Sequence, residues 1–160
     1  MKKTHFVLLL LSTLLVLSAF ALSQVYSGDY AVIVNPNNPV QNISSTQLRK
    51  IVLGDEKFWT GRIPVSLILQ NERAVEHDFV LRRLVNMTQG DYKEHWSTLV
   101  FRGVVASEPL TVPSNGLASG LVQSQIGAVC IMRIDNVPKS AVKVLRVDGK
   151  LPGEDGYPLH

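Results

Sequence analysis

The feature that most constrains this chain is a short apolar run followed by a proline-rich turn and a tightly capped helix. The run covers residues 31–34 and leads into Asn35-Pro-Asn-Asn-Pro39, whose prolines lack the backbone N–H that a helix interior or a central strand needs. Ser44, followed three residues later by a glutamine, has the spacing of a capping box, and Gly54 suits the left-handed end of a helix. The sequence therefore predicts a buried strand, a turn and a helix from about Ser45 to Leu53.

Apolar segments and helical patterns alternate along the rest of the chain. Strands are predicted at residues 63–69, 127–132 and 142–147, and helices at residues 74–85, after Thr88 and after Ser114. The strand at 63–69 is apolar almost throughout, as in a sheet that helices cover on both faces. This alternation favours an α/β fold with a mostly parallel sheet flanked by helices.

The two tryptophans and the single cysteine are predicted to belong to the core. Trp96 lies in a helical stripe with Tyr92 and other apolar residues, and Trp59 follows the first helix. Each is more plausible as a packing anchor than as a platform for a sugar or a base. Cys130 lies inside an apolar run, so we expect a buried thiol that forms no intramolecular disulfide.

The first residues have the pattern of a secretory signal. Lys2 and Lys3 precede an apolar run from Phe6 to Leu17, and small residues at Ala19 and Ala21 fit the cleavage site. We predict a signal peptide over residues 1–21 and a periplasmic or secreted protein. The alternative is an uncleaved membrane anchor, but the run of about twelve apolar residues is short of the ~20 that span a bilayer.

Composition and motifs argue against two classes of function. Without the predicted signal, 14 basic residues face 13 acidic ones, and there is no basic stripe or aromatic platform of the kind that binds nucleic acid. The sequence has no metalloprotease, α/β-hydrolase or P-loop motif. We therefore expect no nucleic acid partner, no enzyme activity, no cofactor and no metal.

The opening motif resembles the phosphate-binding protein of phosphate ABC transporters and related periplasmic solute-binding proteins. In that family a strand reading Val-Val-Asn-Pro-x-Asn-Pro precedes Leu-Ser-x-x-Gln-Leu-x-x-Ile-(Phe)-x-Gly-x-x-x-x-Trp. The matching residues here are Val34 to Val40, Ser44, Gln47, Leu48, Ile51, Gly54 and Trp59. Weaker matches follow at residues 126–128, near the family's Ile-Gly-Tyr, and at residues 157–159. The resemblance implies a periplasmic-binding-protein-like fold over nearly the whole mature chain.

The resemblance also implies that this chain corresponds to one lobe of a two-lobed receptor. In the full receptors the strand at Ala31 crosses from a first lobe, and the chain continues beyond the Tyr-Pro-Leu segment. We expect a small single-lobe member of the superfamily, with residues 22–160 forming one domain. Two-lobed receptors bury their ligand by closing one lobe over it, and a lone lobe lacks that closure.

The candidate ligand site is the loop after the strand at 63–69. A loop that joins the carboxyl end of a strand to a helix N-terminus is a common place for an anion. In the receptors the corresponding stretch resembles Arg-Ser-Asp-Gly-Ser-Gly-Thr, which falls here on residues 71–77 when the chains are aligned on Phe79. The candidate ligand-binding residues are Asn71, Arg73 and His77. The alternative interpretation is a solvated first helical turn.

Two carboxylates replace small or uncharged residues in this loop. Glu72 and Glu76 lie beside the candidate donor Arg73, and Glu76 falls where the receptors have a glycine. One such charge about 5 Å from a bound monoanion costs about 3 kcal/mol at an effective dielectric of 20. We expect the ligand site to be degenerate, and we expect Glu76→Ala to change stability by no more than about 0.5 kcal/mol, as for a surface residue.

Two functional hypotheses follow. In the first, the exported domain is a non-catalytic periplasmic interaction or regulatory module that contacts another protein. In the second, it is a solute-binding component for phosphate or another small oxyanion in ABC-type uptake, working with a membrane permease. The missing closure favours the interaction module, unless the protein forms a homodimer or docks on a partner.

Overall fold

A computed structural model describes residues 28–160 of the chain. The predicted signal peptide and its cleavage site lie outside the described residues. Within the described part, no helix is both long enough and apolar enough to cross a membrane.

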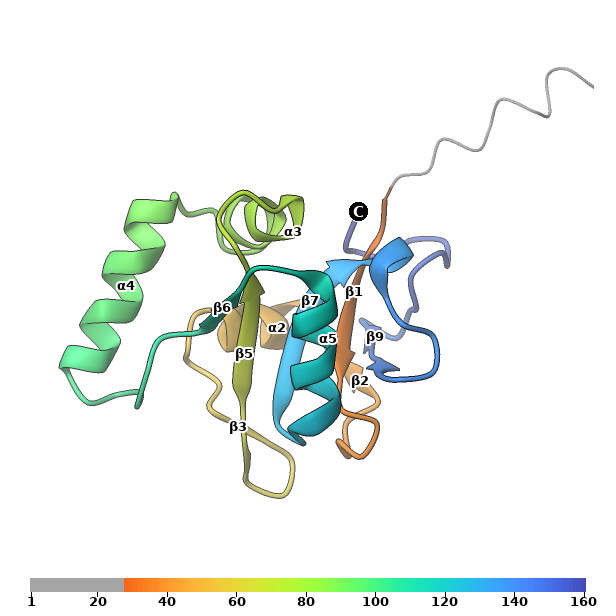
Figure 1. Ribbon diagram of the computed structural model, residues 1–160, viewed down its shortest axis with the longest axis horizontal. Coiled ribbons are helices and arrows are strands. Elements are labelled where there is room, and N and C mark those ends of the chain that lie inside the picture. Colours follow the sequence, from red (N-terminus) through yellow and green to blue (C-terminus); the bar gives the residue numbers. More distant parts are fainter. Residues whose placement is uncertain (1–27) are drawn as a thin grey trace, which may run out of the picture.

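A five-stranded sheet forms the centre of the fold, in the order β6-β5-β7-β1-β8 (Figure 1). β5 is parallel to both β6 and β7, whereas β1 lies antiparallel between β7 and β8. All the strands except β1 therefore run in one direction, which confirms the mostly parallel α/β sheet. The strands are β1 (Tyr30–Val34), β5 (Ser66–Gln70), β6 (Leu110–Val112), β7 (Ala128–Arg133) and β8 (Lys143–Val144).

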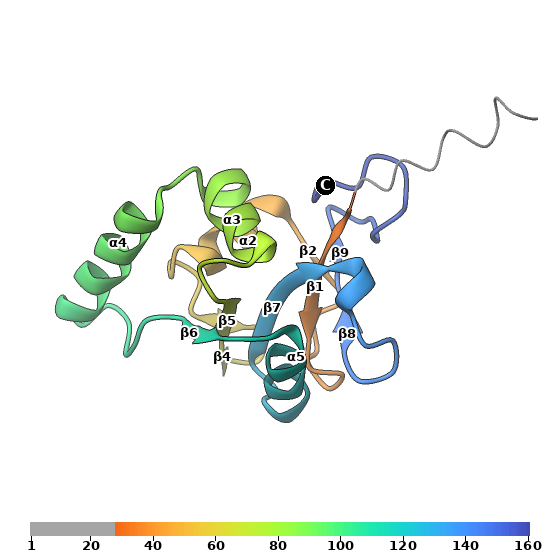
Figure 2. The same cartoon turned by 45° about the horizontal axis from the view of Figure 1, so that its top comes forward.

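Helices cover both faces of this sheet (Figures 1 and 2). The helix α5 (Asn115–Ser124) packs on one face, where it contacts Ala31 and Ile33 of β1. The opposite face carries α2 (Ser45–Val52) and the helical segment of residues 75–85, and here Val32 and Val34 point into the core. The helix α4 (Gln89–Phe101) lies to one side of the sheet, beyond β6 (Figure 1), and its Tyr92 and Trp96 hydrogen-bond to Val52 of α2. Successive residues of a strand point to opposite faces, so a strand covered on both sides must be apolar throughout.

Two predicted strands are divided in the structure. The segment 63–69 contains β4 (Ile63–Pro64), which pairs with β3 (Phe58–Trp59), and then β5 of the central sheet. The segment 142–147 contains β8 and then β9 (Arg146–Val147), which pairs with β2 (Asn42–Ile43). The second division arises because the chain changes partner: the N–H of Leu145 donates to Val32, and the next N–H donates to Gln41.

The predicted helix starts are confirmed. The side chains of Ser44, Thr88 and Ser114 each accept a hydrogen bond from the backbone N–H three residues later, and Thr88 forms a complete capping box with Asp91. The predicted helix at 74–85 consists of a short α3 (Val75–Asp78) continued by a π-helical segment, η1 (Phe79–Val85).

The asparagines of the Asn-Pro motif are structural in this fold. The buried Asn35 amide donates to the carbonyls of Val122 (3.1 Å) and Gln123 (2.7 Å) at the end of α5. Asn38 is also buried and donates to the carbonyl of Ile126 at 3.1 Å. Because these carbonyls have no partner within the helix, the motif caps α5 and fixes it to the turn after β1.

Candidate functional site

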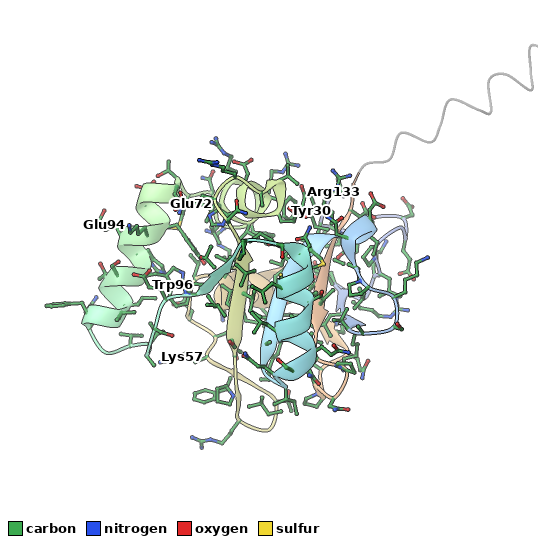
Figure 3. The ribbon with its side chains drawn as sticks, in the orientation of Figure 1. Tyr30, Lys57, Glu72, Glu94, Trp96 and Arg133 are labelled. Carbon is green, nitrogen blue, oxygen red and sulfur yellow. The ribbon has the colours of Figure 1, made fainter. Side chains whose placement is uncertain are left out.

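The candidate site lies at the carboxyl edge of β5, β6 and β7. Three segments leave the sheet there: the loop of residues 71–74 that leads into α3, the start of α5, and the 3₁₀ turn η2 (Ile134–Asn136). Figure 3 shows Glu72 at this edge, near α3, with Tyr30 and Arg133 farther along it. Ligands of α/β folds commonly bind at this edge of the sheet.

The structure places Asn71 and Arg73 in different roles. Asn71 holds the loop in shape, because its Oδ1 accepts the N–H of Arg73 at 2.9 Å and its Nδ2 donates to the carbonyl of Pro113 at 3.2 Å. The side chain of Arg73 is exposed and takes part in none of the ion pairs found between residues 28 and 160. Arg73 is therefore the cation that this loop presents to solvent.

His77 lies inside the protein, so the solvated-turn interpretation is wrong for this residue. It is 4% exposed, and its Nδ1 lies 2.7 Å from the carbonyl oxygen of Gln70. A carbonyl only accepts, so Nδ1 carries the hydrogen of this bond. The other ring nitrogen, Nε2, lies 2.7 Å from Oε1 of Gln89, whose Nε2 donates to Glu72 at 3.0 Å. His77 thereby joins the end of β5 to the start of α4.

Glu76 is also buried, which corrects the expectation of an exposed charge. It is 3% exposed, and its Oε1 accepts hydrogen bonds from Nδ2 of Asn115 (3.2 Å) and Nδ2 of Asn136 (3.0 Å). Oδ1 of Asn115 in turn accepts a hydrogen bond from the buried Gln70 amide at 3.1 Å. The edge of the sheet therefore carries a connected polar network in which α3, α5 and η2 meet at one carboxyl group.

The sequence contains a signal for this burial. His77 and Glu76 precede the buried Leu81 and Val80 by four residues each, and residues four apart share a helix face. Val75, the apolar residue at the start of the same helix, is 55% exposed. Projecting the apolar pattern backwards from η1 identifies both buried polar residues, whereas their distant amide partners leave no local signal.

Electrostatics at this edge follow from burial. Burial raises the pKa of the Tyr30 hydroxyl, and the nearby Glu76 carboxyl group raises it further. Burial also raises the pKa of the Cys130 thiol from 9.0 to about 12. A thiol with so high a pKa is a poor nucleophile near neutral pH. Within residues 28–160 no three His, Cys, Asp or Glu side chains are grouped so as to hold a metal ion.

Several clefts open on the described surface. A shallow one of about 690 Å³ is lined by Arg73 and Arg83 together with Tyr30, the α3 turn and His160. A second, of about 310 Å³, lies away from this edge, between the turn after α2, the start of β5 and the segment before β6, and it includes Lys57 and Trp96 (Figure 3). The candidate residue Arg73 thus borders the first cleft, whereas His77 borders two smaller ones, of about 220 and 130 Å³, which Glu72 and Gln89 also line.

No family model and no curated protein sequence matches this chain. Solved structures do match. An ABC-type phosphate transport receptor from Vibrio cholerae is 21% identical, with a TM-score of 0.54 over 78% of this chain and 48% of the receptor. A putative phosphate ABC transporter substrate-binding protein from Clostridium perfringens, solved with bound phosphate, is 20% identical, with a TM-score of 0.62 over 77% of this chain and 46% of that protein.

A third structure, PstS from Borrelia burgdorferi, is 15% identical, with a TM-score of 0.60 over 78% of this chain and 49% of its own. This chain therefore spans about half the length of the receptors that it matches. At sequence identities of 21%, 20% and 15%, the similarity shows a shared fold and nothing more. The resemblance read from the sequence is confirmed at that level: the chain has the periplasmic-binding-protein-like fold of phosphate ABC transporter substrate-binding proteins.

Proposed function

We propose that this chain is an exported, non-catalytic domain that acts by contacting another periplasmic protein, and that its own oxyanion site is degenerate. The proposal rests on the hydrogen bonding at this edge of the sheet, where the buried polar side chains find their partners within the protein. Gln70, Glu76 and His77 are buried there and hydrogen-bond within the protein. A ligand approaching this edge meets few free donors, chiefly the exposed side chains of Arg73 and Arg83 that line the shallow cleft.

The charges near Arg73 also disfavour a tightly bound anion. Glu72 lies one residue away and Asp78 lines the same cleft, although Arg82 pairs with Asp78 at 2.5 Å. A surface arginine that already lies beside a carboxylate contributes little free energy to the binding of another anion, because exposed ion pairs contribute only about 0–1 kcal/mol. We infer that phosphate affinity is no tighter than about 100 μM, or −5.5 kcal/mol.

The alternative is a solute-binding component for phosphate or another small oxyanion, working with an ABC permease. The shallow cleft that Arg73 and Arg83 share favours it, as does the phosphate bound in the C. perfringens protein of the same fold. A second copy of this chain, or a permease, would have to cover the cleft to exclude water from it.

Isothermal titration of the purified chain with phosphate separates the two functions. We expect no binding tighter than about 100 μM, and we expect Arg73→Ala to abolish any weak signal, since it removes the exposed cation of the loop. Arg102→Ala is the matched control, because Arg102 is exposed at the end of α4 and lines none of those four clefts. A micromolar affinity that Arg73→Ala removes would overturn the interaction module in favour of solute binding.

A further inference from the structure

The carboxyl group of Glu76 is held by hydrogen-bond donors, as a bound anion would be, and takes part in no ion pair of the described residues. Its carboxyl group is buried, yet the ion pairs of residues 28–160 involve Asp78, Asp135 and Glu154, and none of them includes Glu76. A buried carboxylate without a countercharge needs hydrogen-bond donors to remain stable. Here the donors are neutral side-chain amides from two segments far from Glu76 in the chain.

These donors converge from separate parts of the fold. Asn115 is the first residue of α5 and Asn136 ends η2, so they lie after β6 and after β7 respectively. Both direct an Nδ2 at the same oxygen of Glu76, at 3.2 and 3.0 Å. Two N–H donors from different loops that meet at one oxygen form a small donor site, which suits the oxygen of a carboxylate or another small anion.

We propose that the Glu76 carboxylate is a tethered anion that fills a small-anion site made by Asn115 and Asn136, and thereby keeps free anions out. This inference rests on the proposed degenerate site and names the residue that closes it. The change Glu76→Ala removes the carboxylate and one methylene and keeps both amides, which leaves room for a monocarboxylate as small as formate or acetate. The ligand class is therefore a small monocarboxylate. In the native protein the carboxylate of the Glu76 side chain takes this place.

Chemical rescue tests the proposal. The variant Glu76→Ala is heated in sodium formate and in sodium chloride of equal ionic strength, and unfolding is followed by circular dichroism. We expect Glu76→Ala to melt at least about 4 °C below wild type in chloride, and about 100 mM formate to recover about 3 °C or more in a saturable way. In wild type and in Glu76→Gln a side chain still fills the site. For each of these two proteins, the melting temperature in formate should equal that in chloride.

A second variant tests the donors. Adding Asn136→Ala to Glu76→Ala removes one of the two amides, so the double variant should lose at least half of the formate rescue. Equal melting of Glu76→Ala in formate and chloride would overturn the tethered-anion proposal, and so would an equal formate effect on wild type. Either result leaves the interaction role standing, because that role is tested by the phosphate affinity of the unmodified chain.

If Glu76→Ala does not fold, the exposed side of the site provides the test. Asn136→Asp directs a second carboxylate at Glu76, whereas Asn136→Ala only removes a donor. We expect the aspartate variant to melt about 3 °C or more below the alanine variant at pH 7, because like charges repel at hydrogen-bond distance. Equal melting temperatures of the two variants would show that no charged carboxylate occupies the site.

Discussion

Replacing Trp96 by alanine tests how α4 is held against the rest of the domain. Trp96 is 6% exposed and lies on the side of α4 that faces the core (Figure 3). Its Nε1 donates to the carbonyl of Val52 at 3.3 Å, and the Tyr92 hydroxyl donates to the same oxygen at 2.8 Å. The ring also packs on Gly54, where an added Cβ would lie 2.9 Å from it.

The size of the effect follows from the buried area. A tryptophan side chain buries about 150–250 Å², worth about 4–6 kcal/mol at about 25 cal/mol per Å². The indole hydrogen bond adds little, because Val52 keeps the bond from Tyr92 when the indole is removed. With partial relaxation of the cavity, we expect Trp96→Ala to lower the free energy of unfolding by about 3–5 kcal/mol.

Urea titration followed by circular dichroism measures this loss. The matched control is Phe101→Ala at the end of the same helix, where the side chain is 92% exposed and the change should stay within about ±0.5 kcal/mol. A loss below about 1 kcal/mol for Trp96→Ala, or equal losses for the two variants, would refute the packing argument.

Three further predictions concern separate parts of the fold. Gly127→Ala should cost about 2–3 kcal/mol in urea titration, because its Cβ would lie 1.9 Å from a backbone oxygen, whereas Gly116→Ala, where nothing lies within 4 Å, should cost nothing. Asn35→Ala should cost about 2–3 kcal/mol in the same assay, because two carbonyls at the end of α5 lose their donor. Cys130 should resist iodoacetamide at pH 8 in the folded protein. Since burial raises its pKa from 9.0 to about 12, its stabilising contribution should be full below pH 9 and decline from there to pH 12. The free energy of unfolding should therefore fall less steeply over this range in Cys130→Ala than in wild type.

Local spacing in the sequence was enough to predict much of the fold. The caps at Ser44, Thr88 and Ser114 lie where expected, because a cap needs only a side chain and an N–H three residues away. Trp59 and Trp96 are buried as expected, because a large apolar surface is costly to leave in water. The α/β class likewise followed from the alternation of apolar strands and amphipathic helices.

Only the tertiary structure decided the chemistry of the candidate site. The donors to Glu76 stand 39 and 60 residues away in the chain, and Gln89, which contacts His77, begins a different helix. Sequence reasoning therefore treated Glu76 as an exposed charge, and His77 as a candidate ligand-binding residue or part of a solvated turn, although both lie inside. A polar side chain is stable in the interior when distant segments bring it partners, and those partners depend on the order of the strands in the sheet, which no local pattern records.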